Sequence, residues 1–446
     1  MVVDQHKDLL QDERRVWHSM KPYNPDSTMV VTKAAGAWVT DHEGARFLDG
    51  MAGLWCVNIG YGREELAVAA YEQLREMPYY PLTQSHRPAI ELAEKLTELI
   101  GDDYVFFFSN SGSEANETAF KIARQYHQQK GEGNRYKIVA RYRGYHGNTL
   151  GALSATGQAQ RKYKYEPLAP GFIHVRPPDA YRDATGSTGK NLPAVQALDE
   201  TLTWELSETI AAVIMEPIIT GGGIVMPQDG YMKAAKEVCE AHGALLIVDE
   251  VITGFGRTGK AFGFMHYGIK PDIITMAKGI TSAYLPLSAT AVRREVYEAF
   301  KGSEEYDYFR HINTFGGSPA SCAVAVKNID IIQKEKLIDR SARLGEKALN
   351  YLRRKLATHA RVGDVRGKGL LLGIELVKDK STKEPLDGKS VSSVVDYCKQ
   401  KGILIGKNGA TVAGFNNVLA LSPPLVIEEN DLELMLETVV EGISRL

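Results

Sequence analysis

The feature that most constrains the fold of this chain is a series of short, strongly apolar runs. They lie at residues 104–108, 137–141, 211–215, 245–248 and 273–277. Strands that are apolar on both faces must be covered on both faces, as in parallel sheets. Helical stretches separate these runs, so the sequence predicts an α/β fold in which helices cover both faces of a mostly parallel sheet.

The helices between the runs are indicated by apolar residues at helical spacing. They cover residues 89–100, 114–127 and 230–242. Gly101 and Gly243 follow the first and third of these stretches, and glycine commonly stands just past the end of a helix. The sequence therefore marks the ends of two of the three helices.

Toward the C-terminus the pattern changes. Helical spacing over 337–357 and 390–400 alternates with strand-like segments at 369–375 and 403–405, and a last helix starts near residue 428. We interpret these elements as a smaller α+β domain.

The domain organisation follows from chain length and from the absence of linkers. The 446 residues contain no internal repeat, low-complexity tract or long Ser/Pro/Gly segment between independent modules. The length fits a large domain over 61–328 and a small domain built from both chain ends, 1–60 and 329–446.

Charge and composition exclude several classes of function. Lys and Arg number 53 against 55 Asp and Glu, so global charge argues against binding to nucleic acid or an anionic membrane. No apolar stretch approaches the roughly 18 residues of a membrane-spanning helix, and the first residues lack the apolar core of a signal peptide. The four cysteines form no C-x-x-C pair and H-E-x-x-H is absent, so neither a disulfide scaffold nor a metal site is expected. We expect a cytoplasmic protein.

Ligands of open α/β sheets bind beyond the carboxyl ends of the strands, so the residues that follow the apolar runs are the candidates for chemistry. Ser111, Gly112 and Ser113 lie between one run and the next helix. Free N–H groups in the first turn of a helix attract anions, and the serine hydroxyls add donors. The alternative is that Ser111 or Ser113 only caps the helix.

Charged residues end two further runs. Asp249 and Glu250 directly follow 245–248, and at least one of them needs a cationic or protonated partner; a structural ion pair is the alternative. Lys278 ends the run at 273–277 between two small residues. A lysine in a dry site has a lowered pKa and becomes a Schiff-base nucleophile, whereas most lysines at such positions reach solvent.

Two glycine-containing segments complete the set. Tyr145 stands in G-Y-H-G, where its ring can lie flat on a ring-shaped ligand or pack into a core turn. Segment 254–259 matches the dinucleotide pattern G-x-G-x-x-G, but no helical stretch follows it, and Asp272 begins a strand instead of ending one. A phosphate loop is no better supported, because Ala261 stands where Mg²⁺ needs Ser or Thr.

An anion site, a stacking aromatic ring, a buried carboxylate and an isolated lysine are together what pyridoxal 5′-phosphate (PLP) requires. Here the sequence resembles the class III (ω-) aminotransferases, PLP enzymes of fold type I. The resemblance covers nearly the whole chain. It is carried by MAGLWCVNIGYG (51–62), SNSGSEANETAFKIAR (109–124), YRGYHGNTLGALSATG (142–157), MEPIITGGG (215–223), LLIVDEVITGFGRTG (245–259), ITMAKGI (274–280) and NTFGGSP (313–319).

The resemblance implies roles for the strand-end residues. Lys278 would form the Schiff base with PLP and then move a proton from the substrate carbon to the cofactor. Asp249 would partner the pyridine N–H⁺. Ser111, Gly112 and Ser113 would bind the phosphate.

Further cofactor contacts are implied in the same way. Tyr145 would stack on one face of the ring and Val251 on the other, with His146 and Glu216 also at the cofactor. Thr314 corresponds to a threonine that reaches the phosphate of the neighbouring subunit in this family. A homodimer with active sites at the interface is therefore implied, with a tetramer as the alternative.

The substrate is less closely defined by the resemblance. Tyr23, Leu54 and Trp55 match positions that line the amine pocket of relatives acting on ω-amino acids, amines and taurine with pyruvate. The motif at 51–62 resembles that subgroup more than the diaminopelargonate-forming aminotransferases. Many relatives place an arginine for the oxo-acid carboxylate in the C-terminal segment, where this chain has Lys407. Arg161 is the other candidate. The remaining interpretation is that both residues are ordinary surface charges.

The implied reaction is ping-pong transfer of an amino group from an amine donor to pyruvate or another small oxo acid. A PLP-dependent aminomutase of the same fold stays open as an alternative. A nucleotide-dependent enzyme rests only on the glycines of 254–259.

Overall fold

The computed structural model describes residues 13, 15–20, 28–408 and 412–446 of the chain. Its largest sheet has seven strands in the order β4-β10-β9-β8-β7-β5-β6. These strands are β4 (Tyr104–Ser109), β5 (Lys137–Arg141), β6 (Phe172–Val175), β7 (Ile210–Met215), β8 (Leu245–Asp249), β9 (Ile273–Met276) and β10 (Ser288–Arg293).

The pairing in this sheet confirms the prediction of a mostly parallel arrangement. Strands β5 to β9 pair in parallel with one another, and β10 runs antiparallel between β4 and β9. All five predicted strands are present. β6 and β10 were not predicted. β6 is only four residues long, FIHV, and β10, SATAVR, is a mostly buried strand that contains small polar residues and does not form an apolar run.

Helices cover both faces of the sheet. Along β8, Leu245 and Ile247 belong to the core that α5 covers, whereas Leu246 and Val248 belong to the core that contains α4, α9 and α11. The helices around this sheet are α3 (Glu64–Glu76), α4 (Arg87–Ile100), α5 (Gly112–Gln129), α6 (Leu150–Ala155), α7 (Ala159–Lys162), α8 (Pro193–Trp204), α9 (Tyr231–Ala241), α10 (Arg294–Glu298) and α11 (Pro319–Lys334).

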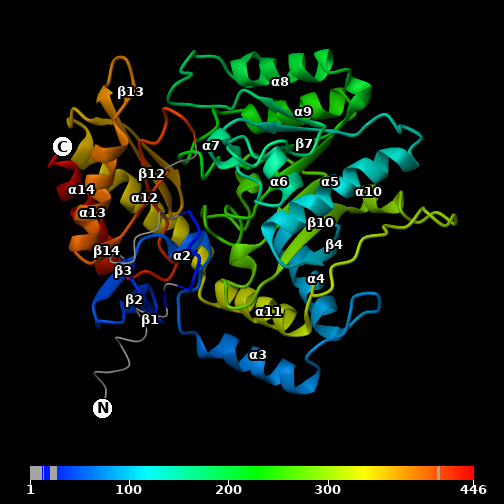
Figure 1. Cartoon of the computed structure of the whole chain (residues 1–446), viewed down its shortest axis with the longest axis horizontal. Helices are drawn as coiled ribbons and strands as arrows, with labels where there is room; N and C mark the ends of the chain where they lie inside the picture. Colours follow the sequence, from blue (N-terminus) through cyan, green and yellow to red (C-terminus); the bar gives the residue numbers. More distant parts are fainter. Residues whose placement is uncertain (1–12, 14, 21–27, 409–411) are drawn as a thin grey trace.

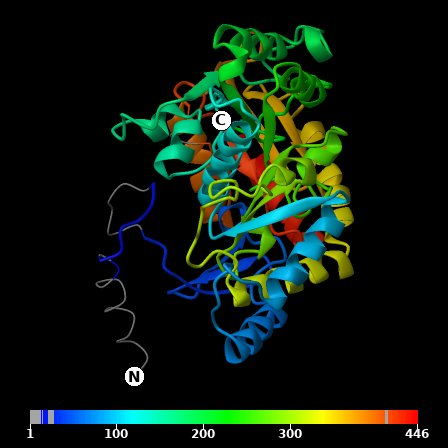
Figure 2. The ribbon, with the colours of Figure 1, turned by 90° about the vertical axis from the view of Figure 1, so that its right-hand side faces the viewer.

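Both predicted glycine ends are found, with Gly101 and Gly243 at positive φ after α4 and α9. α4 starts at Arg87, two residues before the predicted start, because His86 caps it and Pro88 lies in its first turn. α3 and α4 both pack on α11, and Figure 2 shows α3 and α4 below the edge strand β4.

Two smaller sheets lie together at one side of the large sheet (Figure 1). One has the order β1-β2-β3-β14 and the other β11-β12-β16-β15, with β13 paired to β12. Their strands and helices are β1 (Val31–Ala35), β2 (Trp38–Asp41), β3 (Arg46–Asp49), α2 (Ala52–Trp55), α12 (Leu337–Leu356), β11 (Val362–Lys368), β12 (Leu371–Asp379), β13 (Glu384–Pro385), α13 (Gly388–Gln400), β14 (Ile403–Leu404), β15 (Gly406–Lys407), β16 (Val418–Leu421) and α14 (Glu429–Ile443).

The first of these sheets joins the two ends of the chain. β14 pairs in parallel with β3, so Ile403 lies opposite Leu48. The domain boundaries at residues 60 and 328 stay a prediction. The strand predicted at 369–375 is displaced toward the C-terminus, because Gly369 adopts a left-handed φ of 55° and forms the turn before β12.

Two properties of the described part of the chain concern function classes. Within it, no helix is long and apolar enough to cross a membrane. All four cysteines are unpaired.

Candidate active site

A cavity of about 150 Å³ lies at the carboxyl ends of the central strands of the large sheet. It brings together residues that are far apart in the sequence and that follow β4, β5, β7, β8 and β9. Its lining residues are Gly112, Ser113, Asn116, Tyr145, His146, Gly147, Glu216, Asp249, Val251, Ile252 and Lys278.

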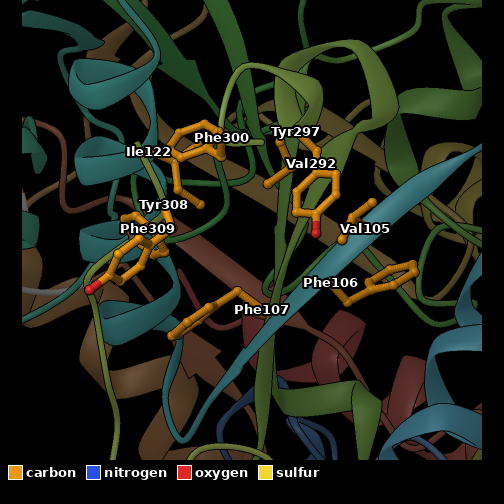
Figure 3. A pocket seen from close by; sticks show the side chains of 9 residues that line it. All are labelled: Val105, Phe106, Phe107, Ile122, Val292, Tyr297, Phe300, Tyr308 and Phe309. Atoms are coloured by element: carbon orange, nitrogen blue, oxygen red, sulfur yellow. The ribbon is translucent and has the colours of Figure 1, made fainter. Parts of the chain in front are cut away.

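A second cavity, of about 200 Å³, lies beside the edge strand β4 and has a different character (Figure 3). Aliphatic and aromatic side chains form its whole lining, with the hydroxyls of Tyr297 and Tyr308 as the side-chain polar groups. It contains no charged or strongly nucleophilic group, whereas the smaller cavity contains carboxylates and a lysine.

Lys278 stands where β9 ends and a short 3-10 helix, Lys278–Ile280, begins. Its backbone has a left-handed φ of 45°, a conformation that costs a non-glycine residue about 1 kcal/mol or more and is typical of functional sites. Within the described chain, no side chain forms a hydrogen bond or ion pair with its ammonium group. Burial lowers the pKa of Lys278 below its usual range, so the amine loses its proton more readily than a surface lysine does.

Asp249 ends β8 and is almost fully buried. Its Oδ2 accepts hydrogen bonds from His146 Nδ1 at 2.8 Å and from Asn116 Nδ2 at 2.9 Å. Its Oδ1 accepts the backbone N–H of Val251 at 3.0 Å. Asn116 is itself fixed by Thr275, whose hydroxyl donates to Asn116 Oδ1 at 2.7 Å. Three donors therefore fix the position of the carboxylate.

Asn116 is a member of the site that the sequence analysis missed. It lies four residues after Gly112 on α5, so both residues project from the same face of the helix. That spacing was the available signal. His146 Nε2 is also buried, and no described residue is its hydrogen-bond partner.

The start of α5 forms the anion-binding end of the cavity. Ser111 caps the helix in a capping box: its hydroxyl accepts the N–H of Glu114 at 3.2 Å, and the Glu114 carboxylate accepts the N–H of Ser111 at 3.2 Å. The Ser113 hydroxyl donates to Asn148 Oδ1 at 2.9 Å. The amides of Gly112 and Ser113 belong to the first turn and have no acceptor within the helix, so they face outward as anion donors.

Gly112 packs closely against Val251. A Cβ atom there would lie 3.0 Å from both methyl groups of Val251, closer than methyl groups normally approach. The Ser111 side chain therefore caps the helix, as the alternative interpretation expected. The backbone amides that follow it remain available to bind an anion.

Glu216 and Tyr145, which follow β7 and β5 in the chain, form one wall of the cavity. The Glu216 carboxylate accepts the N–H of Tyr145 at 3.1 Å, together with the N–H and hydroxyl of Thr220 at 3.0 and 2.7 Å. Burial raises the pKa of Glu216. The guanidinium of Arg161 lies over the Tyr145 ring, 4.8 Å from its centroid, so a cation stands at this side of the cavity.

The two candidates for an oxo-acid carboxylate lie in different surroundings. Arg161 donates from Nε to Gln158 Oε1 at 2.7 Å, and none of the described carboxylates forms an ion pair with it. The Lys407 ammonium instead donates to the Ser392 hydroxyl of α13. The structure therefore brings Arg161, but not Lys407, to the side chains of the cavity.

The candidate amine-pocket residues lie on a strained turn. Ala52, Gly53 and Trp55 all have positive φ, and Asp49 holds the turn by accepting the N–H groups of Met51 at 2.9 Å and Gly53 at 2.6 Å. Leu54, on the same turn, is 65% exposed. Tyr23 lies outside the described residues.

Thr314 does not contribute to the cavity of its own chain. It is exposed on the segment before α11, and its carbonyl accepts the Tyr79 hydroxyl at 2.9 Å.

The nucleotide interpretation of 254–259 is not supported by the structure. No α-helix follows the turn; the next element is a 3-10 helix, Gly263–His266. The glycines serve packing instead, since a Cβ at Gly259 would lie 2.8 Å from the Cβ of Ala342 in α12.

The cavity fits PLP on its own chemistry. Unpaired helix amides suit a phosphate, the buried carboxylate of Asp249 suits a protonated ring nitrogen, and the Tyr145 ring suits stacking on an aromatic face. Lys278 supplies an unpaired amine in the same cavity. These are the groups by which a protein binds and tunes this cofactor.

Comparison with known proteins identifies the family to which this arrangement corresponds. The class III aminotransferase family model matches residues 20–443. The chain is 65% identical over 445 residues to the uncharacterized aminotransferase YhxA of Bacillus subtilis, covering 100% of this chain and 98% of that protein. It is 40% identical over 449 residues to a taurine–pyruvate aminotransferase of Bilophila wadsworthia, with the same coverage.

Solved structures agree with the sequence relatives. An aminotransferase from Bacillus anthracis superposes with a TM-score of 0.98 at 63% identity, covering all of both chains. An amine transaminase from an uncultivated Pseudomonas species, determined in its PLP-bound form, superposes with a TM-score of 0.91 at 35% identity, covering 97% of this chain and 98% of that one.

Proposed function

Because the chain belongs to the class III aminotransferases, which are PLP-dependent transaminases of fold type I, we propose that it moves an amino group from an ω-amino acid or a primary amine to pyruvate or another small oxo acid. Donors of the β-alanine, taurine or arylalkylamine type fit this proposal, and the two half-reactions follow a ping-pong order. The observation that carries it is the cavity that Lys278 and Asp249 line together with Gly112 and Ser113 at the start of α5.

In this proposal Lys278 is the catalytic lysine. PLP, when bound, supplies a protonated ring that stabilises negative charge at the substrate carbon. Lys278 Nζ would hold the cofactor and, once free, would take the proton from the substrate carbon as a general base. Its lowered pKa supports this role, because the unprotonated amine is the reactive form.

The neighbouring residues bind and orient the cofactor. Asp249 keeps the ring nitrogen protonated, and its bonds to His146 and Asn116 hold the carboxylate in position. The amides of Gly112 and Ser113 bind the phosphate. Tyr145 and Val251 cover the two faces of the ring.

We also propose a homodimer with the active sites at the interface, with a tetramer as the alternative. In the dimer Thr314 reaches the phosphate of the neighbouring subunit. This is supported by the exposure of Thr314 and by apolar side chains exposed on its own segment and on the segment of Tyr79, whose hydroxyl bonds to Thr314. They are Tyr79, Tyr80, Tyr308, Ile312 and Phe315.

The donor is best tested with a panel of amines and pyruvate as acceptor. We expect the holoenzyme to use at least one of β-alanine, taurine, 1-phenylethylamine and a diamine, measured as alanine formed. Activity restricted to 8-amino-7-oxononanoate with adenosylmethionine would instead support the diaminopelargonate-type alternative. Isomerised amine without alanine would support an aminomutase.

The acceptor site is tested by two single variants. We assign the acceptor carboxylate to Arg161, because its guanidinium reaches the Tyr145 ring while Lys407 is bound to Ser392. Arg161→Ala is expected to raise KM for pyruvate about tenfold to a hundredfold, the effect of losing a charge-assisted hydrogen bond. Lys407→Ala is the matched control and should leave KM within about twofold. The opposite pattern would assign the site to Lys407.

A further inference from the structure

We propose that Gln158 is a positioning residue for the oxo-acid acceptor, because it holds the guanidinium of Arg161 at the side of the cavity. The proposal rests on the proposed function, in which Arg161 binds the acceptor carboxylate. Gln158 is wholly buried at the start of α7. A buried amide must have partners for both its oxygen and its nitrogen, and the two partners of Gln158 determine which way it points.

Both ends of the Gln158 side chain are bonded. Its Nε2 donates to the backbone carbonyl of Arg143 at 2.8 Å, and its Oε1 accepts from Arg161 Nε at 2.7 Å. A carbonyl can only accept, so the amide nitrogen must face Arg143 and the oxygen must face Arg161. The orientation of the amide is therefore defined by a fixed backbone group.

The group on which Gln158 is anchored is itself rigid. Arg143 has a left-handed φ of 68°, and its buried guanidinium donates to Asp179 Oδ2 at 2.7 Å and to the carbonyl of Gly222 at 2.9 Å. The neighbouring Gly221 leaves room for the amide, since a Cβ there would lie 3.2 Å from Gln158 Nε2. The Gly221–Gly223 run, which the cofactor site does not use directly, thus makes room for this connection.

The connection leaves the outer edge of Arg161 available. Gln158 occupies Nε, and the Tyr145 ring lies against the guanidinium plane. Among the described residues, the one partner of Nη1 is the sulfur of Met20, at 3.6 Å, which is a weak acceptor. The two terminal nitrogens can therefore bind a carboxylate in the bidentate geometry that arginine favours. Without Gln158 this long side chain would have to be ordered each time an acceptor binds.

The test compares two acceptors on the PLP-loaded enzyme, with one amine donor. Pyruvate carries the carboxylate that Arg161 would bind, and propanal does not. Gln158→Leu is expected to raise KM for pyruvate about tenfold, while kcat, KM for propanal and the rate of the donor half-reaction stay within about twofold. If leucine at this buried position prevents folding, Gln158→Met keeps the linear shape, lacks both hydrogen bonds and serves for the same comparison.

Arg161→Ala is measured beside the Gln158 variants. It separates the assignment of the acceptor carboxylate to Arg161 from the positioning role of Gln158. If Arg161→Ala raises KM for pyruvate and the Gln158 variants do not, the positioning role is wrong and the acceptor site stands. If Arg161→Ala leaves KM for pyruvate unchanged, the acceptor assignment is wrong and the role of Gln158 with it. Equal increases in KM for pyruvate and propanal in the Gln158 variants would show a general structural role and would overturn the proposal.

Discussion

Replacing Lys278 by alanine is expected to reduce turnover by more than about 10⁴-fold, because the variant loses both the covalent link to PLP and the general base. Lys278 is the one lysine among the residues that line the cavity, so no other lysine there can take over the proton transfer. The fold should be retained, since the Lys278 ammonium makes no ion pair or hydrogen bond with the described residues. The measurement is steady-state formation of alanine from pyruvate and the best donor.

Two further readouts distinguish loss of chemistry from loss of structure. Borohydride reduction and peptide mass spectrometry should find the cofactor attached to Lys278 in the parent enzyme and to no lysine in the variant. Methylamine in the medium should restore part of the activity of the variant, because a small primary amine can occupy the position of the missing Nζ. Lys260→Ala, at an exposed lysine, is the matched control and should behave like the parent. Full activity of Lys278→Ala, or cofactor attached elsewhere, would refute the assignment.

The large sheet could be predicted because its strands carry a local signal. β5 has the predicted bounds, and β7, β8 and β9 differ from their predicted ranges by one residue. Each is an apolar run that can be stable only between two layers of helices. β10 lacks this signal, because pairing with β4 and β9 on both sides, and not hydrophobicity, places its small polar residues in the sheet.

Site residues that directly follow a strand could be predicted from the sequence. Site residues whose position depends on contacts with other segments could not. Asp249 and Lys278 follow apolar runs, so their place at one edge of the sheet follows from topology alone. Gln158 has no comparable signal, because its importance depends on the carbonyl of Arg143 and on Arg161 across the same loop. The direction of Lys407 likewise depends on how β15 lies beside α13.

The turn that carries Leu54 and Trp55 illustrates the same limit. Positive φ at Ala52 and Trp55 is unfavourable locally, and the turn is maintained by the carboxylate of Asp49, which also accepts the Tyr61 hydroxyl at 2.7 Å. No propensity in the sequence indicates such a conformation. Resemblance of the motif predicted Leu54 and Trp55 as pocket residues, and their backbone geometry is seen only in the fold.

The second large effect is expected at Asp249, which the proposal places at the ring nitrogen of the cofactor. Asp249→Asn should retain PLP, because the phosphate donors and Lys278 are unchanged, but kcat should fall by about 10² to 10⁴-fold. A neutral amide cannot keep the ring nitrogen protonated. An asparagine nitrogen at the position of Oδ2 would also face two donors, His146 Nδ1 and Asn116 Nδ2.

Glu250→Gln is the matched control for Asp249→Asn, since it removes a buried carboxylate from the adjacent position. Glu250 accepts the Thr253 hydroxyl and the N–H groups of Gly263 and Phe264, and its burial raises its pKa to about 7. It does not line the cavity. We therefore expect the Glu250 variant to unfold at a lower temperature while its kcat stays within about threefold. Single-turnover rates with the amine donor alone measure the step in question. Equal loss of rate in both variants would mean that any buried charge at this strand end supports catalysis, whereas a selective loss in Asp249→Asn assigns the electrostatic role to Asp249.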